Sequence, residues 1–352
     1  MANHINISVF RKIIYTITFV CFISISSTWA EQTGFSCESP CFSPNGEYIA
    51  FTGTVKTDDK NESSSVCILR LKDRKIIREI PRAMHPSWSP DGSEILFAAD
   101  DRSSLRISKL NSNTSAPLFS SKDLFRYISS FYTYMSKDGD SGMSVSYDDP
   151  FWSKNGLILF YASFSGADGG DTGVYHYNTK TREFLFYQNS VLDHNPVYSP
   201  ETNLLIVCKA ETCSNNLFFL SDRGYEHRIT MRNIGKNVNP AISPDGKQVA
   251  YSRSDYMTKL LDVAFDLEVY QDYTSNIYIF DLKKAEGENS FQGYSTSDLQ
   301  IKLTNGGYNN WPAWSPDGKK IVFCRSEDPD KDENYRLYIM DLETGKTEKV
   351  EF

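Results

Sequence analysis

Apolar and polar residues alternate along most of the chain after its first forty residues, in short runs that end at Gly, Asn, Asp or Pro. Alternation with a period of two predicts β-strands that bury one face. The runs include VCILRL, LRISKL, GVYHY, NLFFL, NIYIFDL and RLYIMDL, and short polar segments such as ETGK follow them. High aromatic content, with 21 Tyr and 22 Phe, favours the same structure. The pattern predicts an all-β chain.

One phrase occurs six times: a Pro, any residue, a large apolar residue, Ser, a turn and then a strand. The serines of the six copies are Ser43, Ser89, Ser153, Ser199, Ser243 and Ser315. Three of the five intervals between them are 46, 46 and 44 residues, the length of one four-stranded propeller blade. The frequent Pro-Asp-Gly supplies a fixed φ, a carboxylate that caps the turn and a residue free to take positive φ. Each copy therefore marks a chain reversal between two strands.

Each unit then contains four strands, lettered a to d from the repeated phrase outward. A single four-stranded sheet cannot bury both of its faces, whereas six sheets arranged radially can. We predict one domain over residues 31–352, a six-bladed β-propeller of four-stranded antiparallel blades. The blades are expected to begin near residues 38, 84, 148, 194, 238 and 310.

The six copies follow the pattern PxWSPDGxxIAF…IYxxDL…LT between Cys37 and Phe352. This pattern resembles the TolB-type propeller family, a WD40-like group, and the resemblance implies the same six-bladed fold. Some similar propellers are lyases that act on acidic sugars with a metal and a channel-facing His, and others gate a peptidase domain.

The first 30 residues have the features of a secretory signal peptide. Arg11 and Lys12 precede a short apolar run, and Thr28 and Ala30 are small residues before a cleavage position. The apolar run is too short to span a bilayer, and no later stretch is long or apolar enough to do so. We therefore expect a periplasmic or secreted protein without a membrane span after signal removal.

The net charge of the chain restricts its partners further. Removing the signal leaves 35 Lys and Arg against 45 Asp and Glu, a net charge of −10, which argues against a nucleic-acid partner. Export would permit disulfides, and the local pairs Cys37–Cys41 and Cys208–Cys213 are candidates. The disulfide pairing, the mode of ring closure and the oligomeric state stay open at this point.

The long insertions indicate which face of the propeller carries function. Most of them are d–a or b–c connections, which share one face, and elaborated loops on a rigid scaffold are where binding usually occurs. The residues just before each repeated Pro should ring the mouth of the central channel on that face. The predicted ligand-binding residues are Glu38, His85, Asp148, Asp149, His194, Asn195, Asn239, Asn310 and Trp311. The alternative is a water-filled channel whose polar groups bind water and each other.

No cofactor and no catalytic residue is predicted. His85 and His194 with Asp148 or Asp149 could bind a divalent metal of the imidazole–carboxylate kind, but the two histidines belong to blades 2 and 4. Asp328, Asp330 and Asp332 alternate as in a calcium loop without its Gly and Glu. The GDSG motif at 139–142 has no His or Asp partner implied.

A second candidate binding element is the aromatic segment between the second and third copies of the phrase. It contains Phe125, Tyr127, Phe131, Tyr132 and Tyr134, which suit a protein partner or carbohydrate stacking. The alternative is that these rings pack the loop down as a local core.

Together these features favour an exported, non-catalytic propeller. We expect it to bind a protein or peptide in the cell envelope through the face that carries the d–a and b–c loops. The alternative is a carbohydrate-active, lyase-like enzyme with a metal and His site at the channel mouth, formed around His85, His194 and Trp311.

Overall fold

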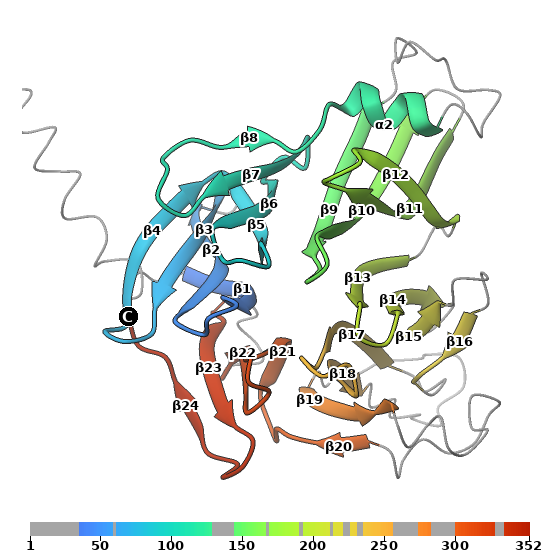
Figure 1. The fold of residues 1–352 in the computed structure, drawn as a ribbon. Coiled ribbons are helices and arrows are strands. Elements are labelled where there is room, and N and C mark those ends of the chain that lie inside the picture. The colour runs from blue at the N-terminus through green and yellow to red at the C-terminus, as the bar shows by residue number, and fades with distance from the viewer. Residues whose placement is uncertain are drawn as a thin grey trace, which may run out of the picture.

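The structure is a computed structural model in which residues 35–58, 61–128, 144–166, 169–189, 193–211, 214–220, 226–230, 235–255, 274–282, 300–327 and 334–352 are described. Strands make up most of these residues, as the alternation predicts (Figure 1). The helix α2 (Ser121–Ile128) has eight residues. Within the described ranges, no helix combines the length and the apolar character needed to cross a bilayer.

The strands pair antiparallel in consecutive sets of four. The first set is β1 (Phe35–Phe42), β2 (Tyr48–Asp58), β3 (Asn61–Arg70) and β4 (Lys75–Pro81). The second is β5 (Ala83–Trp88), β6 (Glu94–Ala99), β7 (Leu105–Lys109) and β8 (Ala116–Pro117). The third is β9 (Ser144–Trp152), β10 (Leu157–Gly166), β11 (Gly169–Asn178) and β12 (Glu183–Asn189).

The remaining strands continue this order. The fourth set is β13 (Asp193–Ser199), β14 (Leu204–Glu211), β15 (Ser214–Leu220) and β16 (Glu226–Arg228). The fifth is β17 (Gly235–Ile242), β18 (Gln248–Asp255), β19 (Thr274–Asp281) and β20 (Gln300–Lys302). The sixth is β21 (Tyr308–Trp314), β22 (Lys320–Ser326), β23 (Arg336–Asp341) and β24 (Thr347–Lys349). Short parallel pairings, β15 with β17 and β19 with β21, join the last three sets.

The repeated phrase folds as the local sequence predicts. In the first copy, the Ser43 hydroxyl donates to Asn45 Oδ1 at 2.6 Å and accepts from the Tyr48 amide at 2.9 Å. In the last copy, Ser315 makes the matching bonds to Asp317 and Lys320 at 2.5 and 2.9 Å. The turn glycines take φ near +70° in both, at Gly46 and Gly318. The serine therefore ties the two ends of each turn, and glycine supplies the left-handed residue.

A buried apolar cluster fills each seam between neighbouring sets, including the seam between the last set and the first. At that last seam Phe35 and Leu69 pack with Cys324 and Leu337, all of them buried. The amide of Cys37 also donates to the carbonyl of Tyr335 at 3.0 Å. Among the described strands, none of the first set pairs with one of the sixth. The ring is therefore completed by packing and isolated hydrogen bonds, with β21 to β24 all supplied by the C-terminal segment.

Candidate functional site

The residue before each repeated proline adopts a left-handed backbone conformation. The φ angles of Ser39, His85, Asp149, Asn195, Asn239 and Trp311 lie between 47° and 55°. At the same points the pairing of each first strand with its neighbour skips two residues, as in a β-bulge. Left-handed φ is costly for residues other than Gly, least so for Asn and Asp, and it is a clear outlier for a bulky residue such as Trp311. Such strained positions tend to cluster at binding sites.

The six bulges surround one central pocket of about 550 Å³. At one end its wall is formed by the six residue-proline pairs of the bulges, from Ser39-Pro40 to Trp311-Pro312. At the other end it is formed by the prolines of the a–b turns. Five of the predicted ligand-binding residues line it: His85, Asp149, Asn195, Asn239 and Trp311. The volume falls within the range of small-ligand sites. The first strands β1, β5, β9, β13, β17 and β21 therefore form the inner wall of the ring (Figure 1).

The other four predicted residues, one step earlier in each strand, lie outside the wall of this pocket. They are Glu38, Asp148, His194 and Asn310. Their side chains instead support the lining residues or neighbouring strands. Asn310 donates from Nδ2 to the Tyr335 hydroxyl at 2.9 Å, and the Tyr335 ring meets Trp311 edge-on at 5.3 Å. Consecutive side chains of a strand point to opposite sides, so only one residue of each adjacent pair faces the pocket.

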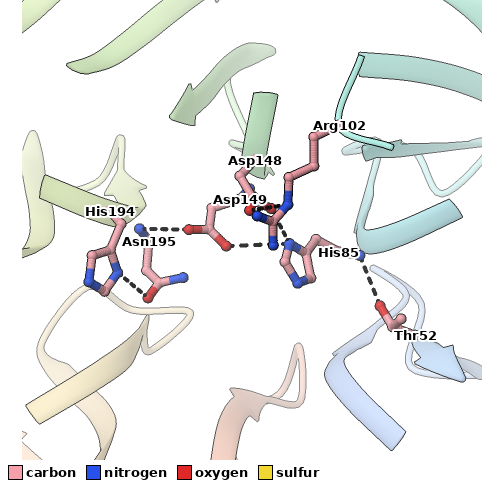
Figure 2. Close-up of polar contacts among 7 residues, drawn as sticks. All are labelled: Thr52, His85, Arg102, Asp148, Asp149, His194 and Asn195. Atoms are coloured by element: carbon pink, nitrogen blue, oxygen red, sulfur yellow. Dashed lines mark hydrogen bonds and ion pairs between the residues drawn. The ribbon is translucent and has the colours of Figure 1, made fainter. Parts of the chain in front are cut away.

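A charged cluster joins the second and third sets at the pocket wall (Figure 2). His85 Nδ1 lies 2.5 Å from Oδ1 of Asp148 and 3.5 Å from Oδ1 of Asp149. Arg102, which the sequence did not single out, places Nε 3.0 Å from the other oxygen of Asp148. The backbone amide of His85 donates to the Thr52 hydroxyl at 2.9 Å. The His85 ring is therefore anchored to the third set and its backbone to the first.

The cluster holds a proton on His85. Burial by itself would lower the pKa of this imidazole, but the hydrogen bond to Asp148 and the charges of Asp149, Asp148 and Glu38 raise it to about 9. The side chain is therefore an imidazolium at neutral pH. Burial would raise the pKa of Asp148, yet the hydrogen bond and charge of His85, with Arg102, lower it. Burial and the adjacent Asp148 charge raise the pKa of Asp149.

Asp149 connects this cluster to the fourth set. Its Oδ2 accepts from the Asn195 amide at 3.1 Å, and the Asn195 side-chain oxygen lies 2.8 Å from Nδ1 of His194 (Figure 2). The two histidines that the sequence predicted at the mouth are thus linked through Asp149 and Asn195. Among the described residues, His85, Asp148 and Asp149 form the group whose potential metal-ligating atoms all lie within 4.8 Å of one another. His194 is not part of it.

The aromatic segment is only partly described. Phe125 lies on α2, is 8% exposed and meets Phe164 of the third set at 5.9 Å between ring centroids. Phe125 therefore belongs to a local core, which is the alternative that the sequence left open, because the amphipathic helix buries this face. Tyr127 is half-buried against Phe184 at 5.7 Å. Phe131, Tyr132 and Tyr134 lie outside the described residues.

Several other sequence features fall in the same gaps. The GDSG motif and the acidic triplet Asp328, Asp330 and Asp332 lie outside the described residues, as does Cys213. The candidate Cys37–Cys41 bridge is not formed, since both are free thiols. Cys37 is fully buried within the seam between the first and last sets, and Cys41 donates from Sγ to the Pro86 carbonyl at 3.2 Å.

Comparison with known proteins gives partial matches. No family model matches the chain. Over 109 residues, 31% of the chain, it is 32% identical to dipeptidyl-peptidase 5 of Porphyromonas gingivalis, and this match spans only 13% of that protein.

Solved structures match most of the chain at low sequence identity. A candidate TolB from Agrobacterium tumefaciens is 19% identical with a TM-score of 0.57, covering 82% of this chain and 88% of its own. TolB from Acinetobacter baumannii is 16% identical with a TM-score of 0.53, and the match covers 89% of this chain and 62% of that one. Oligogalacturonate lyase in complex with manganese is 12% identical with a TM-score of 0.52, covering 90% and 78%. The chain therefore has a TolB-like β-propeller fold.

Proposed function

We propose that this protein is an exported propeller that binds a protein or peptide partner of the cell envelope in its central pocket, without catalysing a reaction. The observation that carries the proposal is the pocket itself. It is walled mainly by proline and aromatic side chains, and one side of its wall carries the charged group of His85 and Asp149 with Asn195. An apolar site with a few convergent polar groups is the usual form of a recognition pocket.

The chemistry of the wall defines the segment that would fit. Prolines and Trp311 offer apolar contact, while Asp149 and Asn195 offer acceptors and His85 a cationic ring. A short peptide that carries an apolar side chain beside a polar one would satisfy both parts. Lysines and guanidinium groups of a partner would be attracted by the excess of acidic residues over the whole chain.

At one end of the pocket a polar contact joins three of the turns. Lys154 Nζ lies 2.7 Å from Glu201 Oε1 and donates to the Pro244 carbonyl at 2.7 Å, which ties the a–b turns of the third, fourth and fifth sets. The opposite face carries the d–a and b–c connections. We therefore infer that the partner reaches the pocket from that face.

A blocking variant tests the proposal. Asn239 lines the pocket in the same left-handed conformation as Trp311, so Asn239→Trp should fold and fill the space. Partners captured from an envelope extract by the wild type are identified by mass spectrometry, and each is then titrated as a purified component by calorimetry. Ile77, 39% exposed on β4, provides the control Ile77→Trp. Binding lost in Asn239→Trp and kept in Ile77→Trp is expected, and equal binding by both variants would refute the central site.

A specific observation favours one alternative, a metal-dependent lyase. His85, Asp148 and Asp149 offer an imidazole and two carboxylates close together, a donor set suited to a divalent transition metal. A metal would supply charge stabilisation at a sugar carboxylate, and it would have to displace the proton that His85 holds. Turnover of acidic oligosaccharides with Mn²⁺, abolished in His85→Ala, would replace the binding proposal.

A further inference from the structure

The central pocket indicates the chemical class of its ligand through the side-chain atoms that the protein leaves without hydrogen bonds. The oxygens on its wall are largely used within the ring. Asp149 Oδ2 accepts from the Asn195 amide at 3.1 Å, and Asn195 Oδ1 lies 2.8 Å from Nδ1 of His194. The Tyr198 hydroxyl donates to Asn203 Oδ1 at 2.7 Å. These side chains therefore retain only part of their capacity to accept from a ligand.

Several donors on the same wall have no partner. His85 directs Nδ1 to Asp148 and Asp149, and Figure 2 shows its other ring nitrogen, Nε2, on the side away from both carboxylates. Because the ring is an imidazolium, Nε2 carries a hydrogen to donate. Among the described residues, neither Nδ2 of Asn195 nor Nε1 of Trp311 has an acceptor, and neither atom is fully enclosed. All three residues line the pocket, so their unused donors are available to a ligand.

Two further residues of the wall can act in either direction. Asn239 and Ser39 line the pocket, and in the described part of the chain their side chains make no hydrogen bond. Free donors are thus supplied by the second, fourth, fifth and sixth sets, on different sides of the pocket. A ligand that excluded water without offering acceptors would leave these donors unpaired, at a cost of about 1–3 kcal/mol each. The ligand should therefore present acceptors in several directions.

The charges at the pocket wall balance one another. The cations of His85 and Arg102 are paired with the carboxylates of Asp148 and Asp149. Burial raises the pKa of the neighbouring Glu38, which favours its uncharged form. A ligand carboxylate near His85 would be repelled by Asp149, and a ligand ammonium group near Asp149 would be repelled by His85. The acceptors of the ligand should therefore be uncharged, as amide carbonyls are.

Apolar contact on the wall comes from rings that keep some exposure. Phe42, Phe151, Tyr198 and Trp311 line the pocket, are half-buried and belong to the first, third, fourth and sixth sets. Grooves lined by aromatic rings are the usual receptors of extended, proline-rich segments, whose own rings pack on them. The ligand should therefore be apolar on several sides as well as rich in carbonyl groups.

We propose that the central pocket binds a proline-rich protein segment in the polyproline II conformation. This inference rests on the function proposed for the pocket and specifies its ligand. Proline has no backbone N–H, so such a segment brings no donor that would compete for the few acceptors of the wall. With about three residues per turn and no internal hydrogen bonds, its carbonyls point in several directions and accept from His85, Asn195 and Trp311. The segment is preformed, which lowers the entropy lost on binding.

The indole N–H of Trp311 provides the readout, and its resonance is assigned in ¹⁵N-labelled protein by its loss in Trp311→Phe. The probes are acetylated, amidated hexaproline and a repeat of Pro-Pro-Leu of the same length. Repeats of Ala-Ser, Ala-Glu and Ala-Lys of that length are the comparators. At least one proline probe should shift the resonance saturably at millimolar concentration and bind more tightly than any comparator. The proposal is wrong if neither proline probe does so, or if a comparator binds as tightly.

A sarcosine oligomer of the same length separates the two parts of the argument, because it lacks backbone N–H groups but is flexible. It should bind more weakly than hexaproline and more tightly than the Ala-Ser repeat. Binding no tighter than that of the Ala-Ser repeat would contradict the argument from unpaired donors.

Variants locate the binding. Asn195→Asp replaces a free donor by an acceptor of the same shape, and it should weaken hexaproline by at least about tenfold, roughly 1.4 kcal/mol, in calorimetric titration. Trp311→Phe should weaken it in the same direction, and Asn239→Trp should abolish binding. Asn305, exposed ahead of β21, gives the matched control Asn305→Asp, which should bind like the wild type. Unweakened binding in both Asn195→Asp and Trp311→Phe would overturn the assignment.

The outcomes separate this inference from the proposed function. If an envelope protein binds the wild type but not Asn239→Trp, and no proline probe binds, the ligand class is wrong and the proposed function stands. If hexaproline binds in the pocket while the envelope extract yields no partner that Asn239→Trp loses, the proposed function fails and the ligand class stands.

Discussion

His85 Nδ1 and Asp148 Oδ1 lie 2.5 Å apart and connect the second set of strands to the third. The two side chains are 16% and 15% exposed, so this is a largely buried ion pair at the wall of the central pocket. Arg102 holds the second oxygen of Asp148 at 3.0 Å. The contact links two sets of the propeller ring, and it also forms the charged side of the pocket.

Stability should depend on pH through this pair. The pKa of His85 rises from its ordinary 6.5 to about 9 on folding, so its contribution is complete below pH 6.5 and is lost as pH rises through 9. The wild type should lose on the order of 3 kcal/mol of unfolding free energy across this window, measured by urea denaturation. His85→Gln should flatten the profile there. A wild-type profile as flat as that of the variant would mean that the histidine is neutral in the folded protein.

The left-handed residue of the bulge can be tested at Asn239, whose φ is 55°. Replacement by Ala should cost about 1–2 kcal/mol of stability, because a Cβ without a compensating polar group is disfavoured in this conformation. Replacement by Gly should cost less, because Gly adopts positive φ freely. Chemical denaturation of both variants makes the comparison, and Ala proving as stable as Gly would argue against the strained conformation.

Trp314 is a packing residue in the seam between the fifth and sixth sets, 9% exposed, and its indole donates to Ala241. Trp314→Ala should lower the unfolding free energy by about 3–5 kcal/mol, since it leaves a large cavity. Trp314→Phe keeps most of the ring volume and should lose mainly the hydrogen bond, about 1 kcal/mol. Equal losses in calorimetric unfolding of the two variants would show that packing is not the main contribution.

Ring closure should depend on packing and not on the surface ion pair across the same seam. Leu337 is fully buried there, and Leu337→Ala should cost about 2–5 kcal/mol. Arg74 and Glu348 lie 2.8 Å apart but are 40% and 48% exposed, so Glu348→Ala should cost less than about 1 kcal/mol. Urea denaturation of the two variants gives both unfolding free energies. A larger loss of stability in Glu348→Ala would mean that the ion pair contributes more to ring closure than the packing does.

Much of the fold is local, and the sequence by itself determined it. The Ser-Pro-Asp-Gly turns, the alternating strands and their grouping in fours follow from bonds such as Ser43 to Asn45, which join residues close in sequence. The sequence also placed His85, Asp149, Asn195, Asn239 and Trp311 at the channel, because equivalent positions in repeated sheets face the same axis.

Only the tertiary structure decided how these positions are used. His85 and Asp149 line the pocket, whereas His194 and Asn310 lie behind its wall. The left-handed bulge at these positions is not predicted by alternation alone. The partnership of Arg102 with Asp148 and the burial of Phe125 depend on which sets pack together and how closely. Such contacts join residues far apart in sequence, and they are fixed by the fit between blades, which no single repeat specifies.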